Sequence, residues 1–320
     1  MKRIVKAFTI SFAVVSLMAT FATAQTFRHT TPSLRPSLVF GAGFGAVSNE
    51  DPTFTAIDFP GSTGTQAWGI NPSGDIVGFY TGAGVTHGFL LSGGNFTSID
   101  FPGAASTSPS GINARGDIVG GYVDADGVTH GSLWSSEDLT FTSIDFPGAK
   151  SSEANGINDE GDIVGDYNLV NKTSCCFQGQ TQGYELSGGN FTTIDVPGST
   201  ITSVSRINPR GDIVGTTFIG KPHGFTLIAG VFTTYEASPN ATYTNGLGIN
   251  PQGDVVGRYV FNGFHGYLLS DGQFTTIDVP GAVFTGNTAI NPRGDIVGRY
   301  RTPDGVFHGF LLSRHKETFD

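Results

Sequence analysis

The stretch Phe54-Thr55-Ala56-Ile57-Asp58-Phe59-Pro60-Gly61 decides the fold, because similar octets recur along the chain at a spacing of 41 to 50 residues. The six copies begin at Phe54, Phe96, Phe141, Phe191, Phe232 and Phe274. A repeat of this length that holds several short strands is typical of a propeller blade. The 47 glycines of the 320 residues fit tight turns and close-packed sheets. The sequence therefore predicts an all-β propeller.

The first complete unit predicts four short strands in one antiparallel meander. Between the first and second strands, Asn71-Pro72-Ser73-Gly74-Asp75 has the residues of a tight turn, and Gly93-Gly94 is a two-residue hairpin turn between the third and fourth. The strands are expected at Gln66–Ile70, Asp75–Tyr80, Thr86–Ser92 and Asn95–Phe101. Apolar residues occur on both faces of these strands, which indicates a sheet packed between neighbours.

The two ends of the repeat array are out of phase, and this predicts a closed ring. The array begins with a lone fourth strand, Phe54–Phe59, and ends after a third strand, His308–Ser313. An open array would expose two sheet edges, whereas a ring lets the first strand complete the last blade. We therefore predict a single six-bladed propeller domain over residues 53–313. The blades are expected at residues 64–101, 106–146, 151–196, 201–237, 242–279, and 284–313 with 53–59.

Counting outward from the Gly93-Gly94 turn places His87 opposite Asp100. The same count gives His130 with Asp145, Gln182 with Asp195, His223 with Glu236, His265 with Asp278, and His308 with Asp58. Directly opposed side chains lie close together, and a partly buried carboxylate needs such a donor. The alternative is a ring of histidines around a metal. Neighbouring third strands should be about 10 Å apart, too far to share one ion, so we expect no metal and no cofactor.

Two further motifs recur between the octets, and the first unit shows them as Gly69-Ile70-Asn71-Pro72-Ser73-Gly74-Asp75-Ile76-Val77-Gly78 and His87-Gly88-Phe89-Leu90. They resemble the HAF-type extracellular repeats of bacterial proteins. The third-strand motif departs from that family, with His-Gly-Phe or His-Gly-Tyr in place of His-Ala-Phe. The resemblance implies an exported bacterial repeat protein. It implies no established activity, and therefore no catalytic residue.

Residues 1–24 are expected to be a cleaved signal peptide. Three basic residues precede the apolar run Ala7–Phe21, and Ala22-Thr23-Ala24 has the small-x-small form of a signal peptidase site. The alternative is a membrane anchor, but a spanning helix needs roughly 20 apolar residues and this run is shorter. We therefore expect a protein exported to the periplasm or the extracellular space, without membrane insertion after cleavage. Residues 25–52 are expected to be a flexible lead-in, and residues 314–320 a tail.

Charge and cysteine content narrow the function classes. The formal net charge is −10, and an acidic surface disfavours nucleic acid as a partner. The two cysteines are adjacent, Cys175 and Cys176. In an oxidising compartment they form either a strained disulfide with each other or two exposed loop thiols. No ligand-spaced partner lies near them in the sequence, which argues against zinc.

Binding is expected on one face of the ring. The Asn-x-x-Gly-Asp and Gly-Gly turns share a face that hardly varies, whereas the loops from fourth to first and from second to third strands carry the variation. The face with the variable loops has three irregularities: the insertion Val170–Thr181, the turn Asp124-Ala125-Asp126-Gly127, and Ser238-Pro239-Asn240 in place of the usual Pro-Gly. The Asp124 turn matches calcium-loop spacing for only four residues, and we interpret it as a solvated turn.

The first strand of each blade is expected to line the central channel. The candidate ligand-binding residues there are Trp68, Glu153, Asn155, Arg206 and Asn287. Arg206 stands where four other blades have glycine and one has alanine. Two interpretations remain open: Arg206 and Glu153 pair with each other, or Arg206 holds an anionic group while Trp68 stacks on a ring.

The sequence favours a secreted, non-catalytic, monomeric propeller that binds a carbohydrate or an exported protein through the variable face. One alternative is a propeller hydrolase or lyase with a site at Glu153 and Arg206. Glycoside cleavage would need a second carboxylate about 5–10 Å from the first, and the channel positions supply only one. The other alternative is a purely structural surface or matrix component.

Overall fold

The computed structural model describes residues 53–170 and 181–313, which form 24 β-strands and no helix. No described segment could therefore cross a membrane as a helix. Blade 1 contains β2 (Gly64–Ile70), β3 (Ile76–Gly82), β4 (Val85–Ser92) and β5 (Asn95–Ile99). Blade 2 contains β6 (Ser106–Ile112), β7 (Ile118–Val123), β8 (Thr129–Trp134) and β9 (Phe141–Ile144). Blade 3 contains β10 (Ser151–Ile157), β11 (Ile163–Asn168), β12 (Thr181–Ser187) and β13 (Asn190–Ile194).

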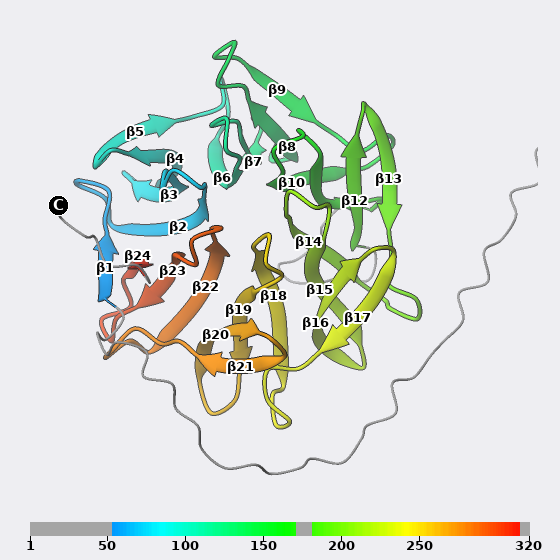
Figure 1. Cartoon of the computed structure of the whole chain (residues 1–320). Helices are drawn as coiled ribbons and strands as arrows, with labels where there is room; N and C mark the ends of the chain where they lie inside the picture. The colour runs from blue at the N-terminus through cyan, green and yellow to red at the C-terminus, as the bar shows by residue number, and fades with distance from the viewer. Residues whose placement is uncertain (1–52, 171–180, 314–320) are drawn as a thin grey trace, which may run out of the picture. The chain divides into compact units, whose positions relative to one another are not determined.

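The other three blades repeat this pattern around the ring (Figure 1). Blade 4 contains β14 (Thr202–Ile207), β15 (Ile213–Ile219), β16 (Lys221–Ile228) and β17 (Val231–Tyr235). Blade 5 contains β18 (Tyr243–Ile249), β19 (Val255–Val260), β20 (Phe264–Ser270) and β21 (Gln273–Thr276). Blade 6 contains β22 (Phe284–Ile290), β23 (Ile296–Arg301), β24 (Phe307–Ser313) and β1 (Thr53–Ile57). Blades 1 to 4 are separate four-stranded sheets, and one bridge between Phe264 and Phe284 joins blades 5 and 6 into a larger sheet.

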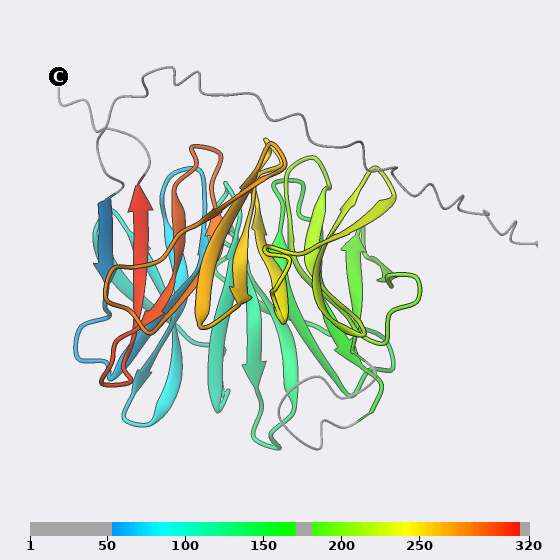
Figure 2. The same cartoon turned by 90° about the horizontal axis from the view of Figure 1, so that it is seen from below.

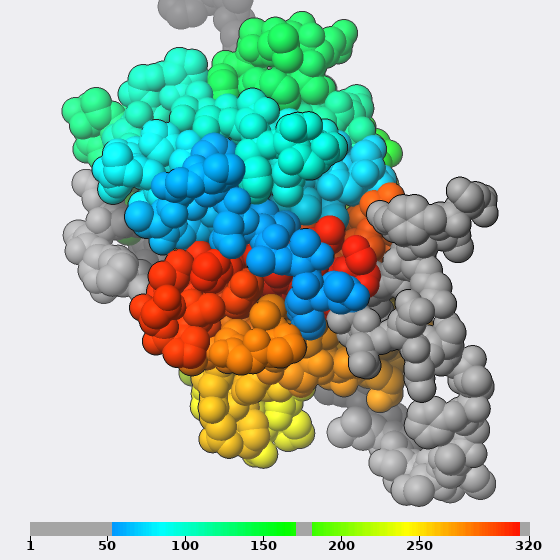
Figure 3. Space-filling model, turned by 90° about the vertical axis from the view of Figure 1, so that its left-hand side faces the viewer, coloured from blue at the N-terminus to red at the C-terminus, as the bar shows by residue number. Residues whose placement is uncertain are grey.

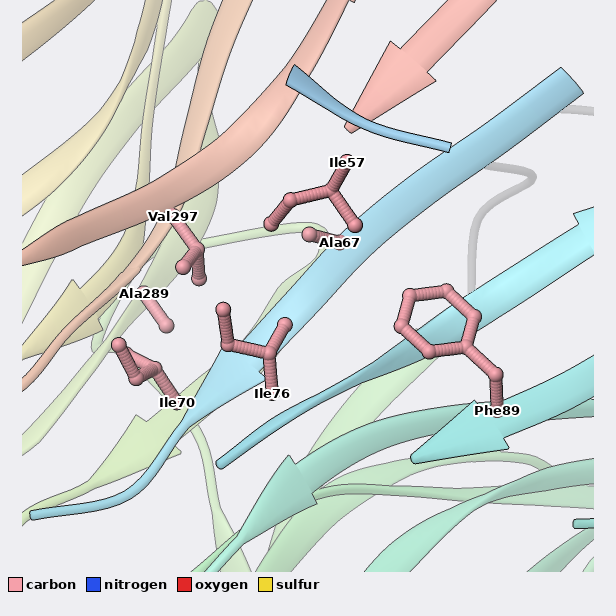
Figure 4. Packing of buried hydrophobic residues seen from close by; sticks show 7 residues of the cluster. All are labelled: Ile57, Ala67, Ile70, Ile76, Phe89, Ala289 and Val297. Carbon is pink, nitrogen blue, oxygen red and sulfur yellow. The ribbon is translucent and has the colours of Figure 1, made fainter. Parts of the chain in front are cut away.

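The predicted ring closure is confirmed. Strand β1 pairs antiparallel with β24, from Thr53 opposite Ser313 to Ile57 opposite Gly309. In the space-filling view the blue N-terminal strand lies against the red C-terminal strand (Figure 3). Closure also buries apolar surface, because Ile57 is 4% exposed and joins a cluster that spans blades 6 and 1 (Figure 4). The first strand in the sequence is therefore the last strand of the ring.

Side chains from adjacent blades make the core, and small residues let the strands approach. Phe89 and Ala67 are fully buried between blades 6 and 1. The recurring glycine after Ile-Val is required by contact: a Cβ on Gly78 would lie 2.0 Å from the Gln66 carbonyl oxygen. This explains why Ile-Val-Gly recurs in the second strands even though glycine weakens an isolated strand.

The loops gather on two opposite faces of the ring, which Figure 2 shows edge-on. The constant face carries the repeated Asn-x-x-Gly-Asp turns. In blade 2 the Asn113 side chain accepts from the Asp117 N–H at 2.9 Å and donates to the Asp117 carboxylate at 3.0 Å. Its amide also donates to the Asn158 carbonyl of blade 3 at 3.2 Å. The repeated turn residues thus connect neighbouring blades. The opposite face, with the loops from fourth to first and second to third strands, is called the variable face below.

Candidate binding site

Histidine–carboxylate contacts connect the third and fourth strands in five blades; four are hydrogen bonds, and the contact of His223 with Glu236 is an ion pair. The Nδ1-to-oxygen distances are 3.0 Å for His87 and Asp100, 3.0 Å for His130 and Asp145, 3.3 Å for His223 and Glu236, 2.7 Å for His265 and Asp278, and 2.8 Å for His308 and Asp58. In blade 3, Gln182 instead accepts from the Tyr167 hydroxyl, and Asp195 accepts from Thr202. Within residues 53–170 and 181–313, no group of three His, Cys, Asp or Glu side chains has the geometry to hold a metal.

Asp124 is engaged within its own turn. One oxygen of its carboxylate accepts from the backbone N–H groups of Asp126 and Val128 at 2.9 and 2.8 Å, and the other lies 3.2 Å from His130 Nε2. The Val128 hydrogen bond is the main reason that the pKa of Asp124 is lowered, with a further contribution from His130. These three contacts stabilise the turn.

Arg206 closes the ring at its axis. Its guanidinium donates to the Trp68 carbonyl of blade 1 at 2.6 Å, to the Ser110 carbonyl of blade 2 at 2.5 Å, and to the Asn155 carbonyl of blade 3. It also donates to the carbonyl of Ser205 in its own blade at 2.8 Å. Four of the six blades therefore meet on one side chain. Burial lowers the pKa of Arg206 to about 10.

These carbonyls are available because the first strand of every blade contains a register shift. In blade 1 the shift lies between Ala67 and Gly69, so that Trp68 has no partner on β3. A bulged residue is left outside the ladder, and its carbonyl is free to accept another donor. Ser110, Asn155 and Ser205 hold the same position in their blades. Of the two interpretations of Arg206, the one in which it holds an anionic group is therefore wrong, because its guanidinium donates to backbone oxygens.

A cavity of about 70 Å³ opens at the axis on the constant face, and Arg206 is among its lining residues. The rest of its wall repeats around the ring, with Ile70, Ile112, Ile157, Ile207, Ile249 and Ile290. This cavity is small and largely apolar, and its walls hardly differ between blades. It offers few groups that would distinguish one ligand from another.

The blades differ most at one cross-strand position near the variable face. The first-strand and second-strand partners at this position are Gln66 and Phe79, Ser108 and Gly121, Glu153 and Asp166, Ser203 and Thr216, Asn245 and Arg258, and Gly286 and Arg299. The second-strand member directly follows the repeated Val-Gly in each blade. We call these six pairs the mouth ring. The strand residues next to the mouth ring are repeated from blade to blade, whereas the mouth-ring side chains differ between most blades.

Blades 5 and 6 supply the basic side of the mouth ring. The Arg299 guanidinium lies 4.6 Å from the centroid of the Trp68 ring and donates to the Gln66 side-chain oxygen. Arg258 and Arg299 both lie over the Phe284 ring, at 5.5 and 5.6 Å. Burial, and then the charge of Arg258, lower the pKa of Arg299 to about 9. The two arginines thus share one aromatic environment where blades 5, 6 and 1 meet.

Blade 3 supplies the acidic side. Glu153 and Asp166 are directly opposed on β10 and β11, which puts their Cβ atoms about 5 Å apart. The channel therefore has a second carboxylate that the first-strand residues alone did not reveal. Asp166 accepts from the Val204 N–H at 2.7 Å and the Ser203 hydroxyl at 2.8 Å, so it also joins blade 3 to blade 4. Nearby Tyr184 has a raised pKa, first because it is buried and then because of Asp166, Asp145 and Glu153.

The remaining predicted site residues have different surroundings. Trp68 lies in the mouth, half-buried, and its indole N–H is buried without a hydrogen-bond partner. Asn155 donates to the Val204 carbonyl at 2.8 Å, and Asn287 donates to the Tyr267 carbonyl at 3.1 Å. Asn287 is fully buried, so the expectation that it contacts a ligand is wrong. Cys175 and Cys176 lie outside the described residues.

The sequence contained a signal for the residues that were missed. The first-strand positions draw attention because they line the channel, but Asp166, Arg258 and Arg299 lie on second strands. Aligning the repeats on Val-Gly shows that the next residue is different in nearly every blade, whereas its neighbours are repeated. Only the strand register shows that this variable position lies opposite the channel-lining residues.

No protein-family model matches the chain, and no curated protein is significantly similar to it in sequence. Among solved structures, the fucose-specific lectin from Aleuria aurantia has a TM-score of 0.50 at 12% identity, covering 80% of this chain and 95% of the lectin. AofleA from Arthrobotrys oligospora has a TM-score of 0.52 at 13% identity, covering 82% of this chain and 87% of that protein. At such identities the similarity concerns the fold.

Proposed function

We propose that the protein is an exported, non-catalytic propeller that binds a carbohydrate at the mouth ring on its variable face. The observation that carries the proposal is the contrast within each blade. Residues that build the strands, turns and blade contacts are repeated, while the mouth-ring position of the second strand is Phe79, Gly121, Asp166, Thr216, Arg258 and Arg299 in turn. A ring of different polar, charged and aromatic groups on a rigid scaffold favours recognition of one asymmetric ligand.

The side chains of the mouth suit a saccharide. A sugar presents hydroxyl groups and apolar C–H faces, which bind to polar side chains and aromatic rings. Gln66 and Glu153 supply polar groups, and Trp68 is a half-buried ring beside them. The fold similarity to a fucose-specific lectin supports a carbohydrate as the first ligand class to test. The negative net charge of −10 favours carbohydrate over nucleic acid.

The catalytic alternative at Glu153 and Arg206 is less well supported. Arg206 donates to four backbone carbonyls, so both of its terminal nitrogens are already engaged in holding the ring together. Asp166, the carboxylate next to Glu153, accepts two hydrogen bonds from blade 4. Both residues have contacts that stabilise the ring, which is sufficient reason for their presence.

A glycan-binding screen on residues 25–320 tests the proposal. We expect binding to a defined set of saccharides, with no change in their chain length after prolonged incubation. Trp68→Ala should weaken that binding at least tenfold, while Pro72→Ala on the constant face should leave it unchanged. Equal loss of binding in both variants, or binding to immobilised exported proteins without any saccharide, would contradict the proposal. Mass spectrometry of the exported chain should show Gln25 as its first residue.

A further inference from the structure

The arginines of this chain fall into groups that differ in what neutralises their charge. On the constant face, Arg115, Arg210 and Arg293 each contact the aspartate two residues further along. Arg206 at the axis donates to four carbonyls. Within the part of the chain that the structure describes, neither Arg258 nor Arg299 forms an ion pair with a carboxylate. Their main neighbours are aromatic rings, and the one side-chain oxygen that accepts from Arg299 is the neutral Gln66 oxygen.

The two unpaired arginines lie close together. Both guanidinium groups are over the Phe284 ring. Gly286, directly opposite Arg299, has no side chain, and a Cβ there would lie 3.7 Å from the Arg258 Cδ. The Phe284 ring is closer still, at 3.3 Å, so no side chain of opposite charge stands at this position between the two arginines, and their like charges repel.

Their donors are incompletely used. The Arg258 Nε is buried without a hydrogen-bond partner, and the same holds for the Nε of Arg301, two residues from Arg299 on the same face of β23. Buried donors without partners are rare in folded proteins and are unfavourable for stability. Two unpartnered guanidinium donors, on Arg258 and Arg301, therefore lie beside Arg299, and no carboxylate of the described residues forms an ion pair with any of the three.

The chemistry around the arginines indicates which anion fits. A guanidinium binds a carboxylate through two parallel hydrogen bonds. Phe264 is 43% exposed, and its ring lies 5.3 Å from the Phe284 ring that both arginines contact. Exposed rings next to a cationic group suit a sugar ring that carries one acidic substituent. A highly charged polyanion suits this site less well, because the whole chain is acidic.

We propose that Arg258 and Arg299 form a subsite for the carboxylate of an acidic sugar residue, at the mouth where blades 5, 6 and 1 meet. This proposal rests on the proposed function and specifies its ligand. The two guanidinium groups bind the carboxylate, and Trp68 and Phe284 hold them in place from behind. The Phe264 ring contacts the apolar face of the sugar. Arg301 adds positive charge at the same edge.

The test compares an oligosaccharide that ends in D-glucuronate with the same oligosaccharide ending in D-glucose, by calorimetry on residues 25–320. We expect the acidic ligand to bind at least tenfold more tightly. Arg258→Gln and Arg299→Gln should each remove that preference, so that the acidic and the neutral ligand bind equally tightly. Arg210→Gln, which makes the same charge change on the constant face, should retain the preference.

The outcomes separate the two proposals. If the neutral ligand binds as tightly as the acidic one, the carboxylate subsite is wrong and the proposed carbohydrate function stands. If neither oligosaccharide binds, and the glycan screen is also negative, both proposals are wrong. If inorganic phosphate displaces the acidic ligand at the concentration at which free glucuronate does, the arginines bind anions in general, and the assignment to a sugar carboxylate is overturned.

Discussion

Arg206 and the Arg258–Arg299 pair lie in the same ring, but they differ in the groups that surround their charges. Arg206 donates to carbonyls from four blades. Arg258 and Arg299 share the Phe284 ring, and burial, with the charge of Arg258 as a further cause, lowers the pKa of Arg299. A buried arginine whose donors meet backbone oxygens stabilises the structure that holds it. Two neighbouring arginines without such oxygens destabilise it.

The difference teaches how to separate scaffold from site in a repeat protein. A residue that breaks the repeat attracts attention, as Arg206 does where other blades have glycine or alanine. Breaking the repeat can nevertheless serve the scaffold, since one closing residue suffices for a whole ring. Unbalanced charge is the better indication of a site, because residues that are unfavourable for stability are expected where function requires them.

The largest effect should come from removing the strand that closes the ring. Deletion of residues 53–58 leaves the edge of β24 unpaired and removes Ile57 from the core between blades 6 and 1. We expect loss of cooperative unfolding, or association through the free edge. Thermal melting with size-exclusion chromatography checks this. A monomer with an unchanged melting temperature would contradict the closed ring.

Arg206→Gly should have the next largest effect. It restores the residue that most blades have at this position, so the repeat pattern alone would predict no cost. Because four carbonyls lose a charged donor, we expect the free energy of unfolding to fall by about 3 kcal/mol. Urea denaturation measures it. A change below about 0.5 kcal/mol would mean that water replaces the guanidinium without loss.

Arg258→Gln and Arg299→Gln should not destabilise the protein, in contrast to Arg206→Gly. Each removes one of two like charges and leaves a neutral side chain of similar length. We expect the free energy of unfolding to stay the same or rise by up to about 1 kcal/mol. The same urea measurement applies, with Arg210→Gln as the control that loses an ion pair to Asp212. Destabilisation of both mouth variants beyond that control would show that the arginines serve the scaffold.

The smallest effect should come from His130, which contacts two aspartates, Asp145 and Asp124. Burial acts to lower the pKa of His130, but Asp145 and Asp124 outweigh it and raise the pKa above the usual 6.5. The charged form therefore stabilises the folded state fully below pH 6.5, and this stabilisation is lost as the pH rises through the higher folded pKa. We expect a loss of about 0.5 kcal/mol.

The free energy of unfolding is measured at about pH 5.5 and about pH 8, on either side of the His130 titration, in the parent chain and in His130→Gln. The pH dependence should be smaller in the variant. An identical pH dependence in both proteins would show that His130 does not titrate differently in the folded state.

Much of the scaffold was predictable because its causes are local. The register of His87 with Asp100 follows from a two-residue turn and a count along two strands. The closure by Phe54 to Phe59 follows from the phase of the repeat at its two ends. The site was less predictable. Trp68 and Glu153 were found from first-strand positions, whereas Arg258, Arg299 and Asp166 were missed because they lie on other strands.

The sequence by itself determined the number of blades, the strand order, the turns and the pairing that closes the ring, since each depends on residues at fixed spacing in one repeat. Only the tertiary structure decided that Arg206 meets the Trp68 carbonyl, 138 residues away in the chain, and that Arg299 lies on the Trp68 ring from the other end of the chain. Such meetings depend on how far each blade is rotated from the next. That rotation results from packing between sheets, which no spacing within a single repeat records.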